Sequence, residues 1–307
     1  MTRSVFIDGG AGTTGLEIAE RLGDRAEFEL IVLEDALRKD AAARREALNA
    51  ADFIILCLPD DAAREAVGMI ENSHVRVIDA SSAHRVADGW TYGFPELVGH
   101  ESVADAWRVS NPGCYPTGFL ALVAPLVRAG LLPADWPYTV NAVSGYSGGG
   151  KALIARFAGD PDIAFRVYGL GLDHKHLPEM QAHAGLAHTP VFAPSVIAAH
   201  RGMVVEVPLP LAAMQGAGSP TDMREWLANF YGASPIVSMG EEPEGELLLR
   251  AGEPGNDRME LFVFANADAS QARLVARLDN LGKGASGAAV QSLNLMAGLP
   301  ETAGLRL

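Results

Sequence analysis

The segment that most constrains this chain is a glycine-rich stretch close to its N-terminus. A GxGxxG pattern over residues 10–15 follows a strand-like apolar run at 5–8 and opens a helical pattern. In that setting the first glycine permits a tight turn, the second lets the backbone approach a pyrophosphate, and the third lets helix and strand pack closely. The pattern therefore predicts a Rossmann-type dinucleotide-binding fold. The cofactor-binding residues expected in this loop are Gly10, Gly12, Thr13, Thr14 and Gly15.

The rest of the N-terminal third favours the same fold class. Further apolar runs at 28–33, 53–58 and 75–79 alternate with helical patterns. Strands that are apolar throughout and separated by helices are typical of a parallel sheet covered on both faces. We therefore predict an α/β chain whose first domain, residues 1–115, is a doubly wound parallel sheet.

The middle of the chain has a different pattern. Four strand-like runs show partial polar alternation, which suits a sheet with one solvated face. We predict an inserted α+β domain with a mixed or antiparallel sheet over residues 116–284, and a helix near 221–231 that interrupts its strands. Residues 285–307 are expected to form a C-terminal helix that returns to the Rossmann domain. The four runs are Thr139–Val143, Met203–Val207, Leu261–Ala265 and Leu274–Leu278, the last two forming a hairpin.

Charge and cysteine content argue against several classes of function. The formal net charge is -14, so a nucleic acid or an anionic membrane surface would be repelled, and we predict neither as a partner. No apolar run reaches the roughly 18 residues of a membrane span, and the N-terminus lacks a signal-peptide layout. Two cysteines, Cys57 and Cys114, are too few for a disulfide framework. We expect a reducing, cytoplasmic location.

Cys114 lies in the segment NPGCYPTG, residues 111–118, directly before an apolar helical pattern. A helix N-terminus stabilises the thiolate and lowers the pKa of a thiol placed there. Most cysteines are small buried hydrophobes, and Cys57, inside the apolar run at 53–58, keeps that interpretation. Cys114 is instead predicted to be a nucleophile.

Four segments together resemble N-acetyl-γ-glutamyl-phosphate reductase, in its shorter form, over nearly the whole chain. They are the glycine loop at 10–15, NPGCYPTG at 111–118, HKHLPE at 174–179 and a glycine-rich stretch at 279–287; the second is the most specific. The family is similar to aspartate-semialdehyde and glyceraldehyde-3-phosphate dehydrogenases in fold and chemistry. The resemblance implies an NADP-dependent, phosphorylating oxidoreductase that reduces an acyl phosphate through a thioester on Cys114, in arginine biosynthesis. A homo-oligomer, dimer or tetramer, is expected.

The choice between NAD and NADP rests on residues that follow the second strand. Glu34 and Asp35 stand where an acid would bind the ribose hydroxyl of NAD, whereas Arg38 could bind the 2′-phosphate of NADP. Charge alone leaves this open, and the resemblance implies NADPH. Further cofactor contacts are expected from Arg38, Ser81, Gly284 and Asn294.

The reduction also requires a proton relay, and a histidine suits proton exchange at neutral pH. His176 is predicted to be the acid/base, because Glu179 lies three residues on and can orient its ring, and because the family motif points there. His174 would then face the substrate. Two histidines and a glutamate could bind zinc, but the reaction needs no metal and none is expected.

The substrate has two anionic groups, a phosphate and a carboxylate, and we expect cationic side chains to bind them. The segment SSAHR at 81–85 follows the strand that ends at Asp79, at the edge of the sheet where ligands gather. Arg85 is expected to bind the leaving phosphate, with Asn111 beside it. Lys151 and Arg258 are candidates for the substrate carboxylate. The glycine-rich stretch at 145–151 nearly matches a P-loop, but Ala152 stands where a P-loop needs Ser or Thr, so it does not predict an ATP site.

Three other functions remain compatible with parts of this pattern. A sibling semialdehyde dehydrogenase of the aspartate type would share the chemistry, although the residues around Cys114 argue against it. A cysteine hydrolase would use a Cys–His pair but has no need of the glycine loop. A non-catalytic NADP-binding module would need neither Cys114 nor His176.

Overall fold

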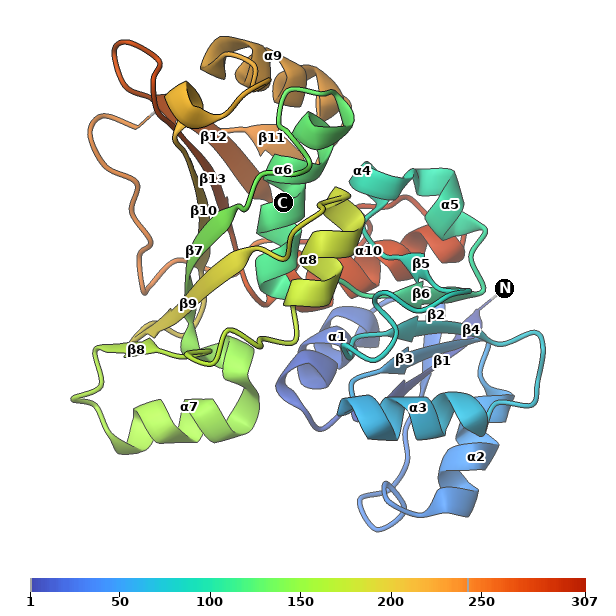
Figure 1. Ribbon diagram of the computed structural model, residues 1–307. Helices are drawn as coiled ribbons and strands as arrows, with labels where there is room; N and C mark the ends of the chain where they lie inside the picture. The colour runs from blue at the N-terminus through green and yellow to red at the C-terminus, as the bar shows by residue number, and fades with distance from the viewer. Residues whose placement is uncertain (1, 242) are drawn as a thin grey trace. The chain divides into compact units, whose positions relative to one another are not determined.

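The computed structural model describes residues 2–241 and 243–307 and divides the chain into two compact units (Figure 1). The first unit comprises Met1–Gly113 and Ala285–Leu305, and the second comprises Cys114–Gly284 and Arg306–Leu307. The chain therefore passes between the units at three peptide bonds, Gly113–Cys114, Gly284–Ala285 and Leu305–Arg306. The first crossing lies two residues before the boundary expected from the sequence.

The first unit contains a six-stranded sheet in which every pair of neighbouring strands is parallel. The strand order is β2-β1-β3-β4-β6-β5, so the chain winds outward from β1 in both directions. This confirms the predicted doubly wound α/β fold. The strands are β1 (Arg3–Asp8), β2 (Phe28–Ile31), β3 (Phe53–Leu56), β4 (Arg76–Asp79), β5 (Thr91–Tyr92) and β6 (Arg108–Ser110).

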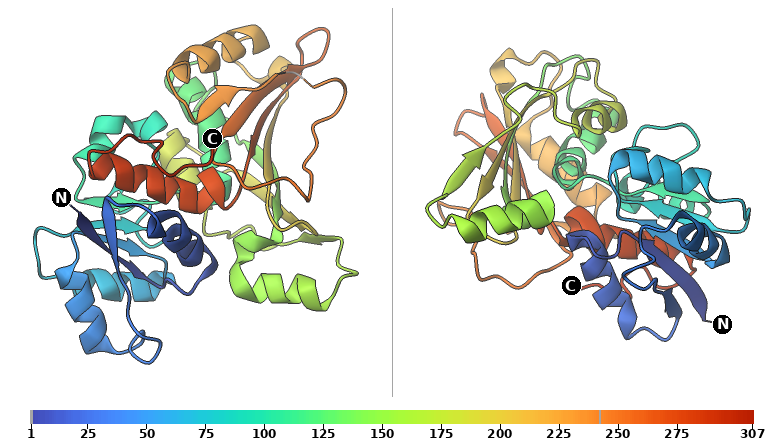
Figure 2. Two further views of the ribbon diagram at one scale, coloured as in Figure 1. Left: turned by 180° about the vertical axis from the view of Figure 1, so that it is seen from behind. Right: turned by 90° about the horizontal axis from the view of Figure 1, so that it is seen from below.

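Helices cover both faces of this sheet. On one face α1 (Thr13–Gly23) and α10 (Gly287–Met296) bury side chains such as Ile18 and Val290, and Figure 2 shows the two helices side by side. On the other face α2 (Ala41–Ala50) and α3 (Asp60–Gly68) bury Leu48 and Ala63. The C-terminal helix α10 thus packs in the first unit, although it lies far along the sequence from the strands of that unit. Two short helices complete the unit, α4 (Pro95–Val98) and α5 (His100–Ala104).

The second unit contains a seven-stranded mixed sheet in the order β11-β12-β13-β10-β7-β9-β8. Strands β11 and β12, and likewise β7 and β9, run parallel, and the other neighbours are antiparallel. The predicted hairpin of β12 and β13 is confirmed. The strands are β7 (Thr139–Gly145), β8 (Phe165–Val167), β9 (Val191–Ile197), β10 (Met203–Leu209), β11 (Val237–Met239), β12 (Met259–Ala265) and β13 (Ala272–Leu278).

The four long helices of the second unit lie on one face of this sheet (Figure 1). The central one, α6, is buried along almost its whole length. It approaches the sheet so closely that a Cβ on Gly118 would lie 2.8 Å from Cγ2 of Val205. The last of the four, the helix expected near 221–231, starts with a capping box between Ser219 and Asp222. These helices are α6 (Cys114–Arg128), α7 (Gly150–Gly159), α8 (Leu177–Ala184) and α9 (Pro220–Phe230).

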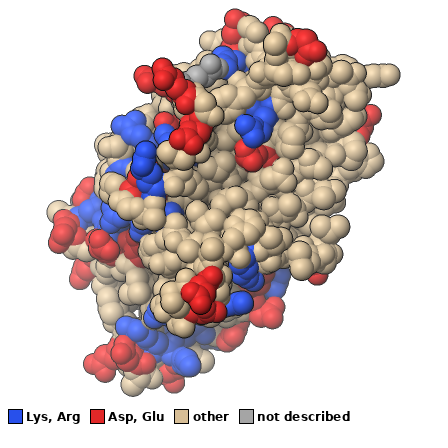
Figure 3. Space-filling model, turned by 90° about the vertical axis from the view of Figure 1, so that its left-hand side faces the viewer, with Lys and Arg blue, Asp and Glu red and all other residues tan. Residues whose placement is uncertain are grey.

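The opposite face of the seven-stranded sheet carries exposed apolar side chains. Phe165, Val167 and Val191 are each about half exposed, at 54%, 53% and 49%. The strand register places them on the face away from α6, because their neighbours Val196 and Phe192 pack on the helix side. Figure 3 shows charged side chains gathered in clusters on the side that it views, next to a broad area that carries none.

Candidate active site

Cys114 is both the first residue of α6 and the first residue of the second unit. Its thiol is partly exposed and forms no disulfide. The loop that closes the second unit comes back beside it, because a Cβ built on Gly284 would lie 3.0 Å from Cβ of Cys114. Within the second unit, the residues at the first two of these crossings, Cys114 and Gly284, therefore lie side by side. Gly284, expected to contact the cofactor, is found next to the predicted nucleophile.

Two tyrosines adjoin Cys114 and form a directed hydrogen-bond chain. The hydroxyl of Tyr115 donates to the carbonyl oxygen of Ser195 at 3.1 Å. A carbonyl only accepts, so the proton of Tyr115 is committed, and the hydroxyl of Tyr168 donates to the Tyr115 oxygen at 3.2 Å. The chain ties the start of α6 to β9 and to the residue that follows β8.

Burial keeps both tyrosines protonated. It raises the pKa of Tyr115 far above its ordinary value, and the negative charges of Tyr168 and Cys114 add to that effect. Burial likewise raises the pKa of Tyr168 to about 12, where the charge of Cys114 also acts to raise it and Tyr115 and Arg166 act to lower it. Around Cys114 the tyrosines are therefore neutral hydrogen-bond donors at physiological pH.

The two motif histidines lie against the same tyrosines. The rings of His174 and His176 are 4.6 Å apart, and each lies near Tyr115, at 6.2 and 5.9 Å between centroids. The backbone N–H of His176 donates to Nδ1 of His174 at 3.2 Å, which leaves Nε2 as the proton-bearing nitrogen of a neutral His174 ring. His176 is 6% exposed and precedes α8, in whose first turn Glu179 is buried at 1%. The structure thus gathers Cys114, His174, His176 and Glu179 in one unit.

The glycine loop of the first unit has the form that a dinucleotide requires. Side chains are excluded from it, because a Cβ on Gly15 would lie 2.7 Å from Cα of Gly10 and 2.8 Å from the oxygen of Gly9. No side chain caps the N-terminus of α1, so its first amides face the loop. Oγ1 of Thr13 is buried there and has no hydrogen-bond partner among the described residues. These residues fit a bound pyrophosphate.

The turn after β4 is held together by Asp79. Its carboxylate accepts from the N–H and hydroxyl of Ser81, at 2.9 and 2.7 Å, and contacts Nδ1 of His84 at 2.6 Å. Arg85, buried at 7%, donates to the carbonyl oxygens of Asn111 and Ala80 at 3.0 and 3.3 Å. Arg85 therefore supports the backbone three residues before Cys114.

Asn111 itself has one end of its amide engaged. Its Nδ2 donates to the carbonyl oxygen of Ala285 at 3.1 Å, while its Oδ1 is buried without a hydrogen-bond partner among the residues described. Both of these residues belong to the first unit. The two points at which the chain leaves and re-enters that unit are thus bridged by this side chain.

Two predicted cofactor residues have intramolecular partners. Arg38 is paired with Asp35 at 2.8 Å on the surface. The amide of Asn294 is fully engaged, since it donates to the carbonyl oxygens of Glu301 and Ala303 and accepts from Arg25. Asn294 therefore fastens the C-terminal segment, and we do not carry it into the proposed site.

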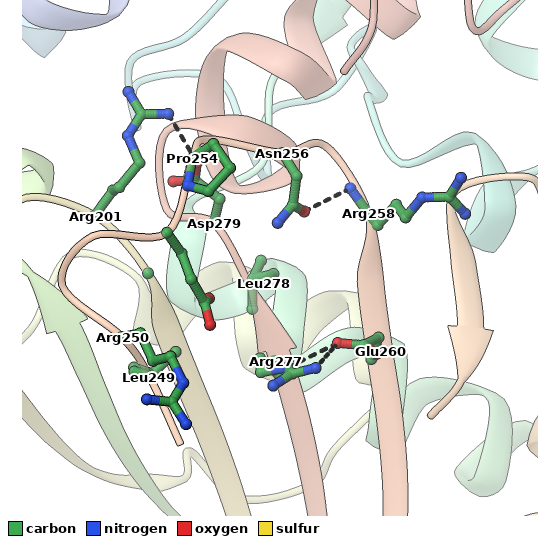
Figure 4. Close-up of a pocket in the computed structure, with 12 residues that line it drawn as sticks. Arg201, Leu249, Arg250, Pro254, Asn256, Arg258, Glu260, Arg277, Leu278 and Asp279 are labelled. Carbon is green, nitrogen blue, oxygen red and sulfur yellow. Dashed lines mark hydrogen bonds and ion pairs between the residues drawn. The ribbon is translucent and has the colours of Figure 1, made fainter. Parts of the chain in front are cut away.

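The two carboxylate candidates lie apart from the histidines. Lys151 is exposed in the first turn of α7. Arg258 lines a polar pocket in which Arg201 pairs with Asp279 at 2.9 Å and Arg277 with Glu260. Figure 4 shows the side chain of Arg258 directed away from these pairs. The paired charges make this pocket a poor anion site.

Two features of this region were not found from the sequence. Tyr168 precedes His174 by six residues, but no spacing rule separates it from the other tyrosines of the chain. Its partner Arg166 lies on the short strand β8, which has no distinctive pattern. By contrast the second cysteine behaves as expected: burial raises the pKa of Cys57 to about 12, and nearby Asp79 and Asp8 contribute.

The described residues contain neither a metal-binding cluster nor a membrane-spanning helix. Within residues 2–241 and 243–307 there is no cluster of three or more His, Cys, Asp or Glu side chains arranged to hold a metal ion. In the same part of the chain, no helix is long and apolar enough to cross a membrane.

Comparisons with known proteins agree with the geometry. Residues 4–106 match the family model described as semialdehyde dehydrogenase, NAD binding domain, and residues 114–280 match its dimerisation domain. The chain is 49% identical over 317 residues to the N-acetyl-gamma-glutamyl-phosphate reductase of Trichormus variabilis, which covers 98% of both chains. It is 50% identical over 303 residues to the enzyme of that name from Burkholderia ambifaria, with 96% of both chains covered.

Solved structures show the same fold at low sequence identity. Aspartate semialdehyde dehydrogenase II from Vibrio cholerae superposes with a TM-score of 0.73 at 17% identity, over 97% of this chain and 99% of that one. Aspartate semialdehyde dehydrogenase with NADP from Candida albicans gives a TM-score of 0.64 at 13% identity, over 97% and 99%.

Proposed function

The chain belongs to the N-acetyl-γ-glutamyl-phosphate reductases of the semialdehyde dehydrogenase family, and we propose that it reduces N-acetyl-γ-glutamyl phosphate to N-acetylglutamate 5-semialdehyde and phosphate. The observation that carries the proposal is the placement of Cys114. It begins α6 next to Tyr115, and the buried ring of Tyr115 lies near Tyr168 and near the two histidines of one motif. The reaction belongs to arginine biosynthesis.

Cys114 is the nucleophile. Its thiolate sulfur attacks the γ-acyl carbon, the bond from that carbon to the phosphate oxygen breaks, and phosphate leaves while the acyl group remains on Cys114 as a thioester. The N-terminal end of α6 stabilises the thiolate before attack. Covalent attachment then holds the acyl group in one position for the second half of the reaction.

NADPH binds the glycine loop and supplies, when bound, the hydride that reduces the acyl carbon. Gly10, Gly12, Thr13, Thr14 and Gly15 hold its pyrophosphate, where the uncapped first turn of α1 and the buried Thr13 hydroxyl support an anionic ligand. Arg38 would bind its 2′-phosphate in place of Asp35, and Ser81 and Gly284 are the other residues that we assign to the cofactor.

His176 moves the proton. It protonates the oxygen that develops negative charge, and it receives the proton again when the tetrahedral thiohemiacetal collapses to aldehyde and Cys114 thiolate. Glu179, buried three residues further along α8, orients the ring and stabilises its protonated form. His174 contacts the substrate, and its neutral Nε2–H is the donor that it offers.

The leaving phosphate is bound by Arg85 and Asn111. Arg85 is buried and is held in position by two backbone carbonyls, and the buried Oδ1 of Asn111 accepts a hydrogen bond from a protonated oxygen of the phosphate. Lys151, in the first turn of α7, contributes positive charge toward the substrate carboxylate and not toward the phosphate. A reducing compartment, the cytoplasm, keeps Cys114 as the free thiol that the mechanism requires.

The active form is a homo-oligomer, built on a dimer. The exposed apolar side chains of Phe165, Val167 and Val191 share one face of the seven-stranded sheet, and that sheet lies within the region matched by the dimerisation-domain model. Contact between two such faces removes apolar area from water, which favours association.

The proposal is tested by NADP⁺ reduction in the phosphorylating direction. We expect the purified protein to oxidise N-acetylglutamate semialdehyde only when phosphate is present, and to prefer NADP⁺ to NAD⁺ in kcat/KM. Aspartate semialdehyde serves as the matched comparison substrate. Equal or faster turnover of aspartate semialdehyde, or turnover without phosphate, would contradict the assignment.

A further inference from the structure

Arg166 is an arginine on the helix-covered face of the second unit's sheet. It is the middle residue of the edge strand β8 and pairs with Val196, whose side chain packs against Leu153 and Phe157 of α7. Side chains alternate along a strand, so Arg166 and Tyr168 share the face on which α6 lies, while Phe165 and Val167 point to the other face.

The guanidinium of Arg166 lies on the tyrosine beside the nucleophile. Its Cζ is 4.5 Å from the centroid of the Tyr168 ring, a distance at which a cation and an aromatic face attract each other. The same ring lies 5.5 Å from the His174 ring, and its hydroxyl donates to Tyr115. Arg166 is thereby fixed at the margin of the cluster formed by Cys114, the two tyrosines and the histidines.

No acidic side chain among the described residues pairs with Arg166. Other arginines of the same unit have such partners: Arg201 with Asp279, Arg273 with Glu206 and Arg277 with Glu260. The contact between the guanidinium and the Tyr168 ring does not use the N–H groups, so the planar fork can bind a carboxylate or phosphate.

We propose that Arg166 binds the α-carboxylate of the acyl substrate. The inference rests on the proposed function, which supplies a substrate with two anionic groups. The phosphate is attached to the carbon that Cys114 attacks, whereas the α-carboxylate stands at the far end of the carbon chain. Arg166 contacts the ring of Tyr168, whose hydroxyl bonds to Tyr115 beside the nucleophile, so Arg166 is linked to Cys114 through two residues and suits the distant group.

The assignment gives the aromatic cluster a role in specificity. Through its ring contact, Tyr168 holds the guanidinium of Arg166 and so fixes where the carboxylate can bind. The acyl carbon at the other end of the substrate then lies toward Cys114. An aldehyde that lacks the carboxylate loses a charge-assisted contact, and the site then discriminates against it.

The phosphorylating assay separates the two anions, because semialdehyde and phosphate are varied independently. Arg166→Gln is expected to raise KM for N-acetylglutamate semialdehyde by about 10- to 100-fold, with KM for phosphate and for NADP⁺ unchanged. The wild type should lose a similar factor in kcat/KM with 4-acetamidobutanal, the analogue without the carboxylate. The variant should use the two aldehydes about equally. Arg250→Gln removes a positive charge from the exposed loop 243–257 and should match the wild type.

Each result supports or overturns the assignment. A rise in KM for phosphate in place of the aldehyde would assign Arg166 to the phosphate and overturn it, as would a variant that keeps the wild-type preference for the carboxylate-bearing aldehyde. An unchanged KM for NADP⁺ reports that Arg166→Gln is folded. Arg166→Lys keeps the charge without the planar fork and should fall between the two. A wild type that is inactive with both aldehydes would contradict the proposed function instead.

Discussion

At the scale of single residues, the surroundings of Cys114 are notable for neutral donors. Tyr115 and Tyr168 are held protonated by burial, and a neutral His174 carries its proton on Nε2 because Nδ1 accepts from the backbone. The two tyrosine hydroxyls donate to Ser195 and to Tyr115, so among these groups the Nε2–H of His174 is the donor proposed to meet the charge that the reaction develops. A histidine is therefore the group that changes its protonation state in the proposed mechanism.

His176→Asn is predicted to reduce kcat by about 10² to 10⁴, the usual loss for a missing general acid/base. His174→Asn should act mainly through KM for the acyl substrate, and Glu179→Gln should fall between the two and shift the pH profile. Tyr168 stays protonated below pH of about 12, so the limbs of the profile between pH 6 and 9 belong to other groups. Rates across that range at saturating NADPH check the assignment. A reversed pattern would exchange the two histidine roles.

How much of this site was predictable differs from residue to residue. Cys114, His174, His176 and Glu179 follow from motifs that are continuous in the sequence, and the structure gathers them. Tyr168 and Arg166 were missed, because their importance comes from the pairing of β8 with β9, a contact between residues far apart in the chain. No local pattern encodes such a pairing.

At the scale of elements, the seating of α6 on the sheet fixes the position of the nucleophile. Gly118 lies one turn into the helix and lets it approach Val205 and Ala276 of two neighbouring strands. A side chain at this point would lift the start of α6 from the sheet. The position of Cys114 is therefore set by packing as well as by local sequence.

Gly118→Ala is predicted to destabilise the protein by about 1–3 kcal/mol, the usual cost of overpacking, because the added Cβ would lie 2.8 Å from Val205. The free energy of unfolding from urea titration measures the change. Gly159→Ala, at the end of α7 with no atom within 4 Å of the added Cβ, is the matched control and should be neutral. Equal effects of the two changes would show that α6 is not tightly seated.

The elements themselves were predictable in proportion to their length and pattern. The helix at 287–296 and the hairpin of β12 and β13 were placed correctly. The strands β5, β6, β8, β9 and β11 were missed: β9 contains Pro194, which argues against a strand in a sequence pattern, and the other four have only two or three residues each. These strands are defined by their partners in the sheet, and that information is not local.

At the scale of the whole molecule, one face of the seven-stranded sheet exposes apolar side chains to solvent. Its exposed apolar residues lie on one side of a sheet whose other side is packed with helices. Formal net charge of -14 keeps chains apart in general, so association must rest on a specific apolar contact of this kind. The sequence indicated an oligomer only through family resemblance, since alternation in short strands does not show which face meets a second copy.

Val191→Glu is predicted to dissociate the oligomer, because two carboxylates would be buried at a symmetric contact. Trp226→Glu is the matched control, since Trp226 is 44% exposed on α9, on the helix-covered side of the sheet. Sedimentation velocity at a fixed protein concentration distinguishes the two variants. A Val191→Glu protein that sediments like the wild type would exclude this face as the contact.

The central claim, a thioester on Cys114, is tested most directly by a burst experiment. The protein is mixed with N-acetylglutamate semialdehyde and NADP⁺ in the absence of phosphate, and NADPH formation is followed while peptide mapping locates the acyl group. We predict a burst stoichiometric with the chain, an N-acetylglutamyl thioester on Cys114 while Cys57 stays free, and steady turnover once phosphate is added. A burst in Cys114→Ser, or an acyl group found on another residue, would contradict the mechanism.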